Sequence, residues 1–92
     1  ISDEAYDGMA FDGRPTPTLG GMDPTAIVVS TFSKMHRAAG LRLGWVRADE
    51  ELVAAATRVA TFQNYSASAA AQVASSIWSA TWPSGSPTVT SI

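Results

Sequence analysis

One lysine, two small hydroxyl residues and one arginine lie close together in the middle of the chain. Thr31 and Ser33 precede Lys34, the only lysine in the sequence, and Arg42 follows it by eight residues. A lysine amine attacks a carbonyl carbon when burial or nearby cations disfavour its ammonium form. Hydroxyl groups and a fixed guanidinium fork suit a phosphate. The stretch therefore predicts that Lys34 holds a phosphorylated carbonyl compound as a Schiff base.

Asp3 and Tyr6 are the candidates for a second side of this site. A buried carboxylate that faces a pyridine nitrogen keeps that nitrogen protonated, and so makes the ring an electron sink. Asp3 is expected at the end of a strand, where ligands bind in α/β folds. Tyr6 follows it by three residues and could hydrogen-bond a phenolic oxygen on the same ring.

Each of these residues also has a purely structural interpretation. Asp3 could be a turn or helix-capping residue, Lys34 a solvated surface group and Arg42 a partner in a surface ion pair. The single histidine, His36, is expected to be an ordinary loop residue. The ordered combination, rather than any single residue, favours a binding site.

Two strands are expected on either side of the lysine. Residues 26–31 are apolar and β-branched without alternation, which predicts a strand buried on both faces. Residues 43–47 predict a second short strand. The segment between the strands is too short for a helical crossover, so it is expected to be a functional loop with about one helical turn. Residues 7–23, rich in glycine and proline, are expected to form another loop.

Two helices complete the predicted α/β fold, near residues 50–62 and 66–82. Asp49 is expected to cap the first helix, whose apolar residues recur at helical spacing. Ser66 is expected to cap the second, which should end before Pro83. Residues 83–92 show no core pattern and are expected to be a disordered or aberrant tail. The chain begins without Met and would leave a sheet face uncovered, so a fragment is expected.

Composition argues against several classes of function. The net charge of −2 disfavours a nucleic-acid or anionic-membrane footprint. The absence of cysteine excludes disulfides and thiolate metal sites, and one histidine offers no transition-metal cluster. No apolar run approaches the ~20 residues that span a bilayer. A cytoplasmic location is expected.

Three motifs together resemble the class I/II aminotransferases, which are fold-type I pyridoxal-phosphate enzymes. They are Ile1–Tyr6, Phe11–Gly13, and Ser30–Lys34 with its Gly40–Trp45 continuation. The resemblance covers roughly residues 1–72. It implies that residues 1–82 are part of the large, cofactor-binding domain, with a mixed sheet in which residues 43–46 form part of the antiparallel portion.

The resemblance also implies roles for the site residues. Lys34 would form the internal aldimine with pyridoxal 5'-phosphate and shuttle a proton between the substrate α-carbon and the cofactor. Asp3 would pair with the pyridinium nitrogen and Tyr6 with the ring's 3-hydroxyl oxygen, while the phosphate ligands would be Thr31, Ser33 and Arg42. The substrates would be an amino acid and a 2-oxo acid. The parent would be a homodimer, with residues 63–68 near the interface.

Two other functions on the same fold remain as alternatives. One is a lyase, decarboxylase or synthase, because the cofactor carries the chemistry and its surroundings select the reaction. The other is the aminotransferase-like effector domain of a transcription regulator, where the resemblance places the arginine one residue closer to the lysine. The five residues between Lys34 and Gly40 favour the enzymes. The isolated chain itself is expected to be inactive.

Overall fold

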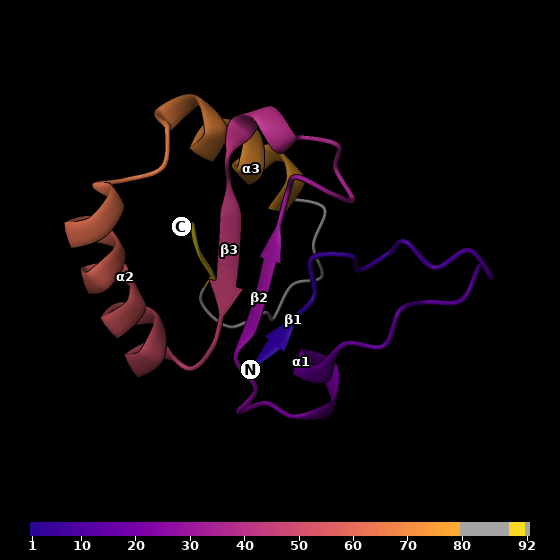
Figure 1. Cartoon of the computed structure of the whole chain (residues 1–92). Coiled ribbons are helices and arrows are strands. Elements are labelled where there is room, and N and C mark those ends of the chain that lie inside the picture. The colour runs from indigo at the N-terminus through magenta and orange to yellow at the C-terminus, as the bar shows by residue number, and fades with distance from the viewer. Residues whose placement is uncertain (80–88, 92) are drawn as a thin grey trace.

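A mixed β-sheet forms the centre of the computed structural model, which describes residues 1–79 and 89–91 (Figure 1). Its strands lie in the order β1-β2-β3-β4. Their bounds are Ser2–Asp3 for β1, Val28–Thr31 for β2, Gly44–Arg47 for β3 and Val89–Ser91 for β4. β1 runs parallel to β2, whereas β2–β3 and β3–β4 are antiparallel. The mixed sheet confirms the predicted α/β class.

Residues 32–43 connect β2 to β3 and form the central loop, which carries Lys34. The register of the β2–β3 hairpin pairs Val28 with Arg47 at one end and Thr31 with Gly44 at the other. Because the two strands are antiparallel, no helical crossover is needed between them. The loop contains one 3₁₀ turn, Ala39–Leu41, as the short connection predicts.

Burial along β2 differs from the sequence prediction. Val28 is fully buried, but Val29, Ser30 and Thr31 are only half-buried. The expectation of a strand buried on both faces is therefore wrong for the described residues. Its apolar composition still suits a pleated, partly covered strand.

Helix α2, Glu50–Asn64, begins where the sequence predicts. The Asp49 side chain accepts a hydrogen bond from the Leu52 amide at 2.9 Å, which satisfies one of the free N–H groups of the first turn. Val53 is buried against the rest of the structure. Leu52 and Val59 belong to the same apolar stripe but are exposed, so the described elements cover only part of that stripe.

Helix α3, Ala69–Ser79, begins later than expected. Ser66 lies three residues before it, so its predicted capping role is wrong. The first intrahelical bond of α3 runs from the Gln72 amide to the Ser68 carbonyl oxygen at 3.0 Å, which places Ser68 rather than Ser66 at the capping position. Residues 80–82 of the predicted helix lie outside the described residues. So does most of the predicted tail, residues 83–88 and 92, whereas β4 places Val89–Ser91 beside β3.

A short helix, α1, interrupts the region predicted as one long loop. It spans Leu19–Met22, and residues 5–18 before it form an arm that projects away from the sheet (Figure 1). Gly20 is buried, and a Cβ atom built on it would collide with the Arg47 guanidinium and lie 3.1 Å from a Val28 methyl. A glycine here lets α1 pack closely on β2 and β3, a tertiary requirement that local composition does not reveal.

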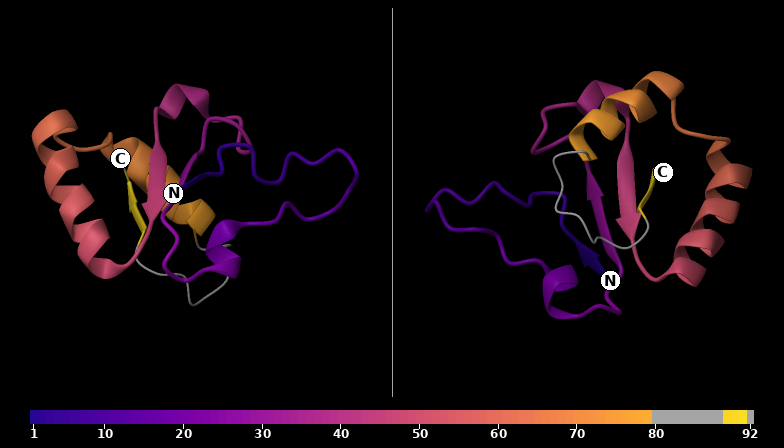
Figure 2. Two further views of the ribbon diagram at one scale, coloured as in Figure 1. Left: turned by 60° about the horizontal axis from the view of Figure 1, so that its bottom comes forward. Right: turned by 180° about the vertical axis from the view of Figure 1, so that it is seen from behind.

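The hydrophobic core lies beneath the central loop. Phe32, Leu43 and Ala71 are buried together, and Trp45 packs against them. In the right view of Figure 2, α3 lies across the ends of β2 and β3 beside this loop. Within the described ranges, no helix is long and apolar enough to cross a membrane.

The cap of α2 gives a direct test of this fold. Asp49→Ala should lower the free energy of unfolding by about 1 kcal/mol, because the Leu52 amide loses its acceptor. Asp49→Asn keeps a capping oxygen and should stay near the wild-type value. Chemical denaturation, with amide exchange at Leu52, measures both; equal stability of the alanine variant and wild type would contradict the cap.

Candidate functional site

β1 and β2 are parallel and end on the same side of the sheet. Their pairing brings Asp3 and Tyr6, after β1, near the central loop, after β2. Asp3 pairs with Val29, so β1 ends two residues before the end of β2 at Thr31. The central loop continues directly from Thr31 on that same side. Carboxyl ends of parallel strands are where ligands commonly bind in α/β folds.

The hydroxyl of Thr31 organises the start of the central loop. Its Oγ1 lies 3.0 Å from Ser33 Oγ and 3.1 Å from the Leu43 carbonyl oxygen, and it accepts the Ser33 amide at 3.1 Å. The Phe32 amide also donates to the Leu43 oxygen, at 3.1 Å. These bonds turn Ser33 back toward the hairpin, so that the two hydroxyls lie side by side.

Arg42 enters the same place from the other end of the loop. Its backbone is left-handed, with φ 50°, and it follows the 3₁₀ turn. The guanidinium Nη1 donates to the Ala39 carbonyl oxygen at 3.4 Å, which uses one of its five N–H donors. Arg42 is otherwise exposed on this surface.

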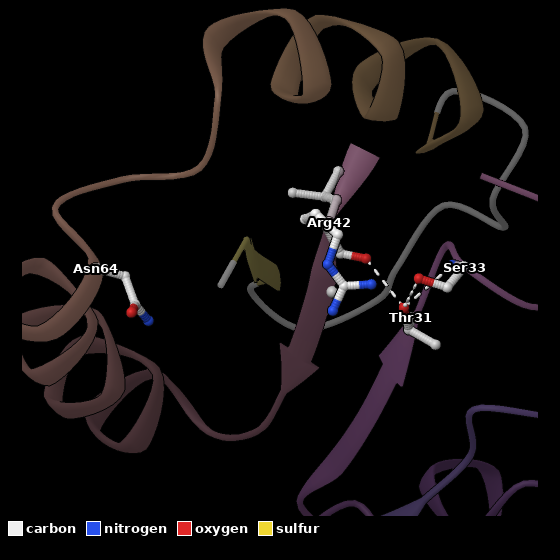
Figure 3. A pocket seen from close by; sticks show the side chains of 6 residues that line it. Thr31, Ser33, Arg42 and Asn64 are labelled. Carbon is white, nitrogen blue, oxygen red and sulfur yellow. Dashed lines mark hydrogen bonds between the residues drawn. The ribbon is translucent and has the colours of Figure 1, made fainter. Parts of the chain in front are cut away.

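These three polar side chains line one pocket of about 270 Å³. Figure 3 shows Thr31, Ser33 and Arg42 together on one side and Asn64 on the other, at the end of α2. Leu43 and Gly44 complete the lining. Sequence reasoning missed Asn64, because nothing in its spacing connects the end of α2 with a hydroxyl more than thirty residues earlier.

Lys34 and Tyr6 form a second group beside the pocket. The Lys34 Nζ lies over the Tyr6 ring, 5.3 Å from its centroid, which is a cation–π geometry. Both side chains are exposed, Tyr6 at 63%. The burial that a buried-type strand suggests for Lys34 is not found, since β2 ends at Thr31 and the loop then runs along the surface.

Asp3 lies at the expected strand end but is engaged locally. Its Oδ1 accepts the Ala5 amide at 3.1 Å, the bond of an aspartate turn. The side chain is exposed and does not line the pocket of Thr31 and Arg42. The geometry thus matches the structural interpretation of Asp3 and leaves its role toward a ring nitrogen a prediction.

Neighbouring residues shape the lysine-bearing turn. The Arg37 amide donates to the Lys34 carbonyl at 3.0 Å, and Arg37 is left-handed, with φ 52°. The His36 ring packs on Phe32, with centroids 5.3 Å apart and planes tilted by 32°. His36 therefore ties the loop to the core, in keeping with its expected role as a loop residue. Among the described residues, no cluster of three or more histidine or acidic side chains could hold a metal ion.

Comparison with known proteins identifies the family. The sequence pattern of "Aminotransferase class I and II" matches residues 1–81. The chain belongs to the class I and II aminotransferases. Aminotransferases of this family generally depend on pyridoxal phosphate. No solved structure matches the chain at a significant level.

Three curated aminotransferases align with this family member. A Rhizobium meliloti protein that carries the name aminotransferase AatC is 36% identical over 78 residues, which cover 80% of this chain and 19% of that protein. A valine–pyruvate aminotransferase of Mycobacterium tuberculosis is 43% identical over 47 residues, 50% of this chain and 12% of that protein. An uncharacterised aminotransferase of Saccharolobus solfataricus is 43% identical over 55 residues, 58% and 14%. The chain spans about a fifth or less of the length of these relatives.

The role of the Thr31 hydroxyl in the central loop of this aminotransferase can be tested without any ligand. Thr31→Val should lower the free energy of unfolding by about 1–3 kcal/mol, because Ser33 loses a partner for its amide and its hydroxyl. Thr31→Ser keeps the oxygen and should stay close to wild type. Denaturation and amide exchange at Ser33 measure the effect; unchanged exchange in the valine variant would show that the hydroxyl does not hold the turn.

Proposed function

We propose that the protein containing this chain is a pyridoxal-phosphate-dependent aminotransferase that moves an amino group between an amino acid and a 2-oxo acid. Family membership supports the reaction class. The observation that carries the proposal is the convergence of Thr31, Ser33 and Arg42 on one pocket, with Lys34 on the loop between them. No second function is favoured by a comparable observation.

The pocket has the chemistry that a phosphate group needs. Two hydroxyls and one guanidinium face a volume of about 270 Å³. Ser33 and Arg42 can donate hydrogen bonds to a phosphate there, whereas the single hydrogen of the Thr31 hydroxyl would first have to leave its partners within the loop. The charged residues around the pocket also favour an anionic ligand. Residues 24–48 contain four cations and no acidic residue, although the whole chain carries −2. The cations are Lys34, Arg37, Arg42 and Arg47. Such a local field attracts anionic ligands.

Lys34 offers the amine that the cofactor's aldehyde requires. When bound, pyridoxal phosphate supplies that aldehyde and a ring able to withdraw electrons. Lys34 Nζ can then accept and return a proton within reach of the reacting carbon, once its exposed surface is covered. The Tyr6 ring, whose centroid lies 5.3 Å from Nζ, is the contact that the structure gives this group.

Asp3 and Tyr6 would contact the ring from the end of β1. We propose that the Asp3 carboxylate stabilises a protonated ring nitrogen and that the Tyr6 hydroxyl hydrogen-bonds the ring oxygen. The parallel β1–β2 pair supports this proposal, because it sets both residues at the edge from which Lys34 projects. The Asp3 carboxylate would have to exchange its bond to the Ala5 amide for the ring nitrogen.

A second subunit is part of this proposal. Large apolar residues remain exposed on α2 and just after it: Leu52, Val59, Phe62 and Tyr65. Exposed apolar surface of this extent is typical of a face that another domain or subunit covers. We propose that residues 63–68 lie near the interface of a homodimer, where Asn64 could serve a ligand in the pocket.

The lysine assignment is tested on the full-length protein. Borohydride reduction of the cofactor-loaded protein, followed by peptide mass mapping, should place the adduct on Lys34. Lys34→Arg keeps the charge and should lower kcat/KM by about 10³-fold or more, because proton transfer at Nζ is lost. An adduct on another residue would overturn the assignment. An adduct on Lys34 without conversion of an amino acid to its 2-oxo acid would point to a lyase or decarboxylase.

The phosphate assignment is tested by two arginines of the same chain. Arg42→Ala should raise the Kd for pyridoxal phosphate by about 10- to 100-fold, because a charge-assisted hydrogen bond is lost. Arg58→Ala removes another exposed guanidinium, on α2, and should leave the Kd unchanged. Fluorescence or absorbance titration measures both. Equal effects of the two substitutions would show that Arg42 acts only through net charge.

A further inference from the structure

Glu4 stands between Asp3 and Tyr6 but takes no part in the proposed chemistry. Its side chain is turned away from the pocket and toward α1. Oε2 accepts a hydrogen bond from the Thr18 hydroxyl at 2.7 Å, and Oε1 accepts the Leu19 amide at 2.9 Å. The two oxygens of one carboxylate thus bind both residues at the start of α1, fourteen and fifteen positions further along the chain.

The carboxylate replaces the missing cap of α1. Thr18 occupies the capping position, but its hydroxyl makes no side-chain capping bond and donates to Glu4 instead. A negative charge at the start of a helix stabilises the free N–H groups there. Burial tends to raise the pKa of Glu4, but hydrogen bonds from Thr18, Leu19 and Ser2 and the charge of Arg47 together lower that pKa. Glu4 is therefore ionised at neutral pH.

The backbone of Glu4 is also hydrogen-bonded to the sheet. Its amide donates to the Val29 oxygen at 2.8 Å, and its carbonyl accepts the Ser30 hydroxyl at 2.9 Å. Glu4 thus joins β2, through its main chain, to α1, through its side chain. Glu4 directly precedes the arm of residues 5–18, and its carboxylate binds the residues at the other end of that arm.

The arm in turn touches the lysine-bearing loop. The Asp7 amide donates to the Glu4 backbone carbonyl oxygen at 3.1 Å. This bond starts the turn that places the Tyr6 ring under Lys34. Gly8 packs so closely on Met35 that a Cβ atom built on it would lie 2.9 Å from the Met35 sulfur. One further bond, from the Gly8 amide to Thr16 Oγ1 at 3.1 Å, crosses the arm.

We propose that Glu4 is a positioning residue, whose carboxylate holds the base of the arm closed so that Tyr6 stays against Lys34. It acts through Tyr6 and touches neither the pocket nor the amine. Loss of the carboxylate frees the Thr18 hydroxyl and the Leu19 amide and so removes the side-chain link between the two ends of the arm. The contacts that remain include the packing of α1 on the sheet, the Asp7–Glu4 backbone bond, the Gly8–Thr16 bond and the packing of Gly8 on Met35. The effect on the cofactor rests on the proposed function, whereas the effect on the arm does not.

The first experiment follows the arm in cofactor-free, full-length protein. Phe11, near the middle of the arm, is a chymotrypsin site. Its side chain is exposed, but the protease must bind several neighbouring residues in extended form, which requires the arm to open at its base. Glu4→Ala should speed cleavage there by about tenfold or more, because cleavage follows the population of the opened arm. Thr18→Val removes one of the same bonds from the other side and should have a smaller effect. Glu51→Ala, on the first turn of α2, is the matched control and should leave the rate unchanged.

The second experiment separates positioning from general stability. In the cofactor-loaded protein, the pH midpoint of the visible absorption should move in the same direction for Glu4→Ala and Tyr6→Phe. The double variant should move no further than Tyr6→Phe alone, because Glu4 acts through Tyr6.

Each outcome decides one claim. Equal cleavage rates for Glu4→Ala and Glu51→Ala would overturn the closed arm. Faster cleavage with additive spectral shifts would overturn the link to Tyr6. A wild-type protein that binds no pyridoxal phosphate would overturn the proposed function and the link to the cofactor, while the cleavage rates would still decide whether Glu4 closes the arm.

Discussion

The carbonyl oxygen of Leu43 joins the two ends of the loop that carries Lys34. It accepts the Phe32 amide and lies within hydrogen-bonding distance of the Thr31 hydroxyl, both at 3.1 Å. Beneath it, Leu43 and Phe32 bury their side chains in the same core cluster. This closure fixes the distance between the hydroxyls at the start of the loop and Arg42 at its end. The pocket depends on it, because its polar lining comes from both sides of the closure.

The backbone conformation within the central loop restricts the loop further. Arg37 and Arg42 both adopt left-handed backbone, which costs a side-chain-bearing residue about 1–2 kcal/mol. The turn bond from Arg37 to Lys34 and the 3₁₀ turn before Arg42 hold these conformations in place. Backbone of this kind is retained where the surrounding structure determines it, and it gathers at sites with a function. Lys34 is thus carried on a main chain with few alternatives, while its Nζ lies over the Tyr6 ring.

The sequence allowed prediction of the parts that follow from local pattern. The strands around the lysine, the Asp49 cap and the hairpin connection without a crossover all rest on runs of neighbouring residues, and the structure confirms them. The site residues around the pocket were also found from their types and spacing, although their roles remain predictions. Capping by Ser66 was wrong, because α3 begins at Ala69 and the residue directly before it is Ser68.

What could not be predicted depends on residues distant in sequence. The Glu4 carboxylate meets α1 across the whole arm, and Gly20 is required by β2 and β3 rather than by its own helix. Asn64 reaches the pocket only because α2 runs back along the sheet. Exposure of Lys34 and of the α2 stripe depends on which elements cover them, and composition carries no signal of that coverage.

The mixed sheet also sets an order in which the site can assemble during folding. The β2–β3 hairpin joins neighbouring strands through one short loop, whereas β1 reaches β2 only after the arm and α1 have been brought back. Closing the shorter loop costs less chain entropy, so the hairpin with Lys34 and Arg42 is expected to form first. Asp3 and Tyr6 join it with the later parallel pairing. The hydroxyls and the arginine of the pocket can therefore be in place before the residues from β1 arrive.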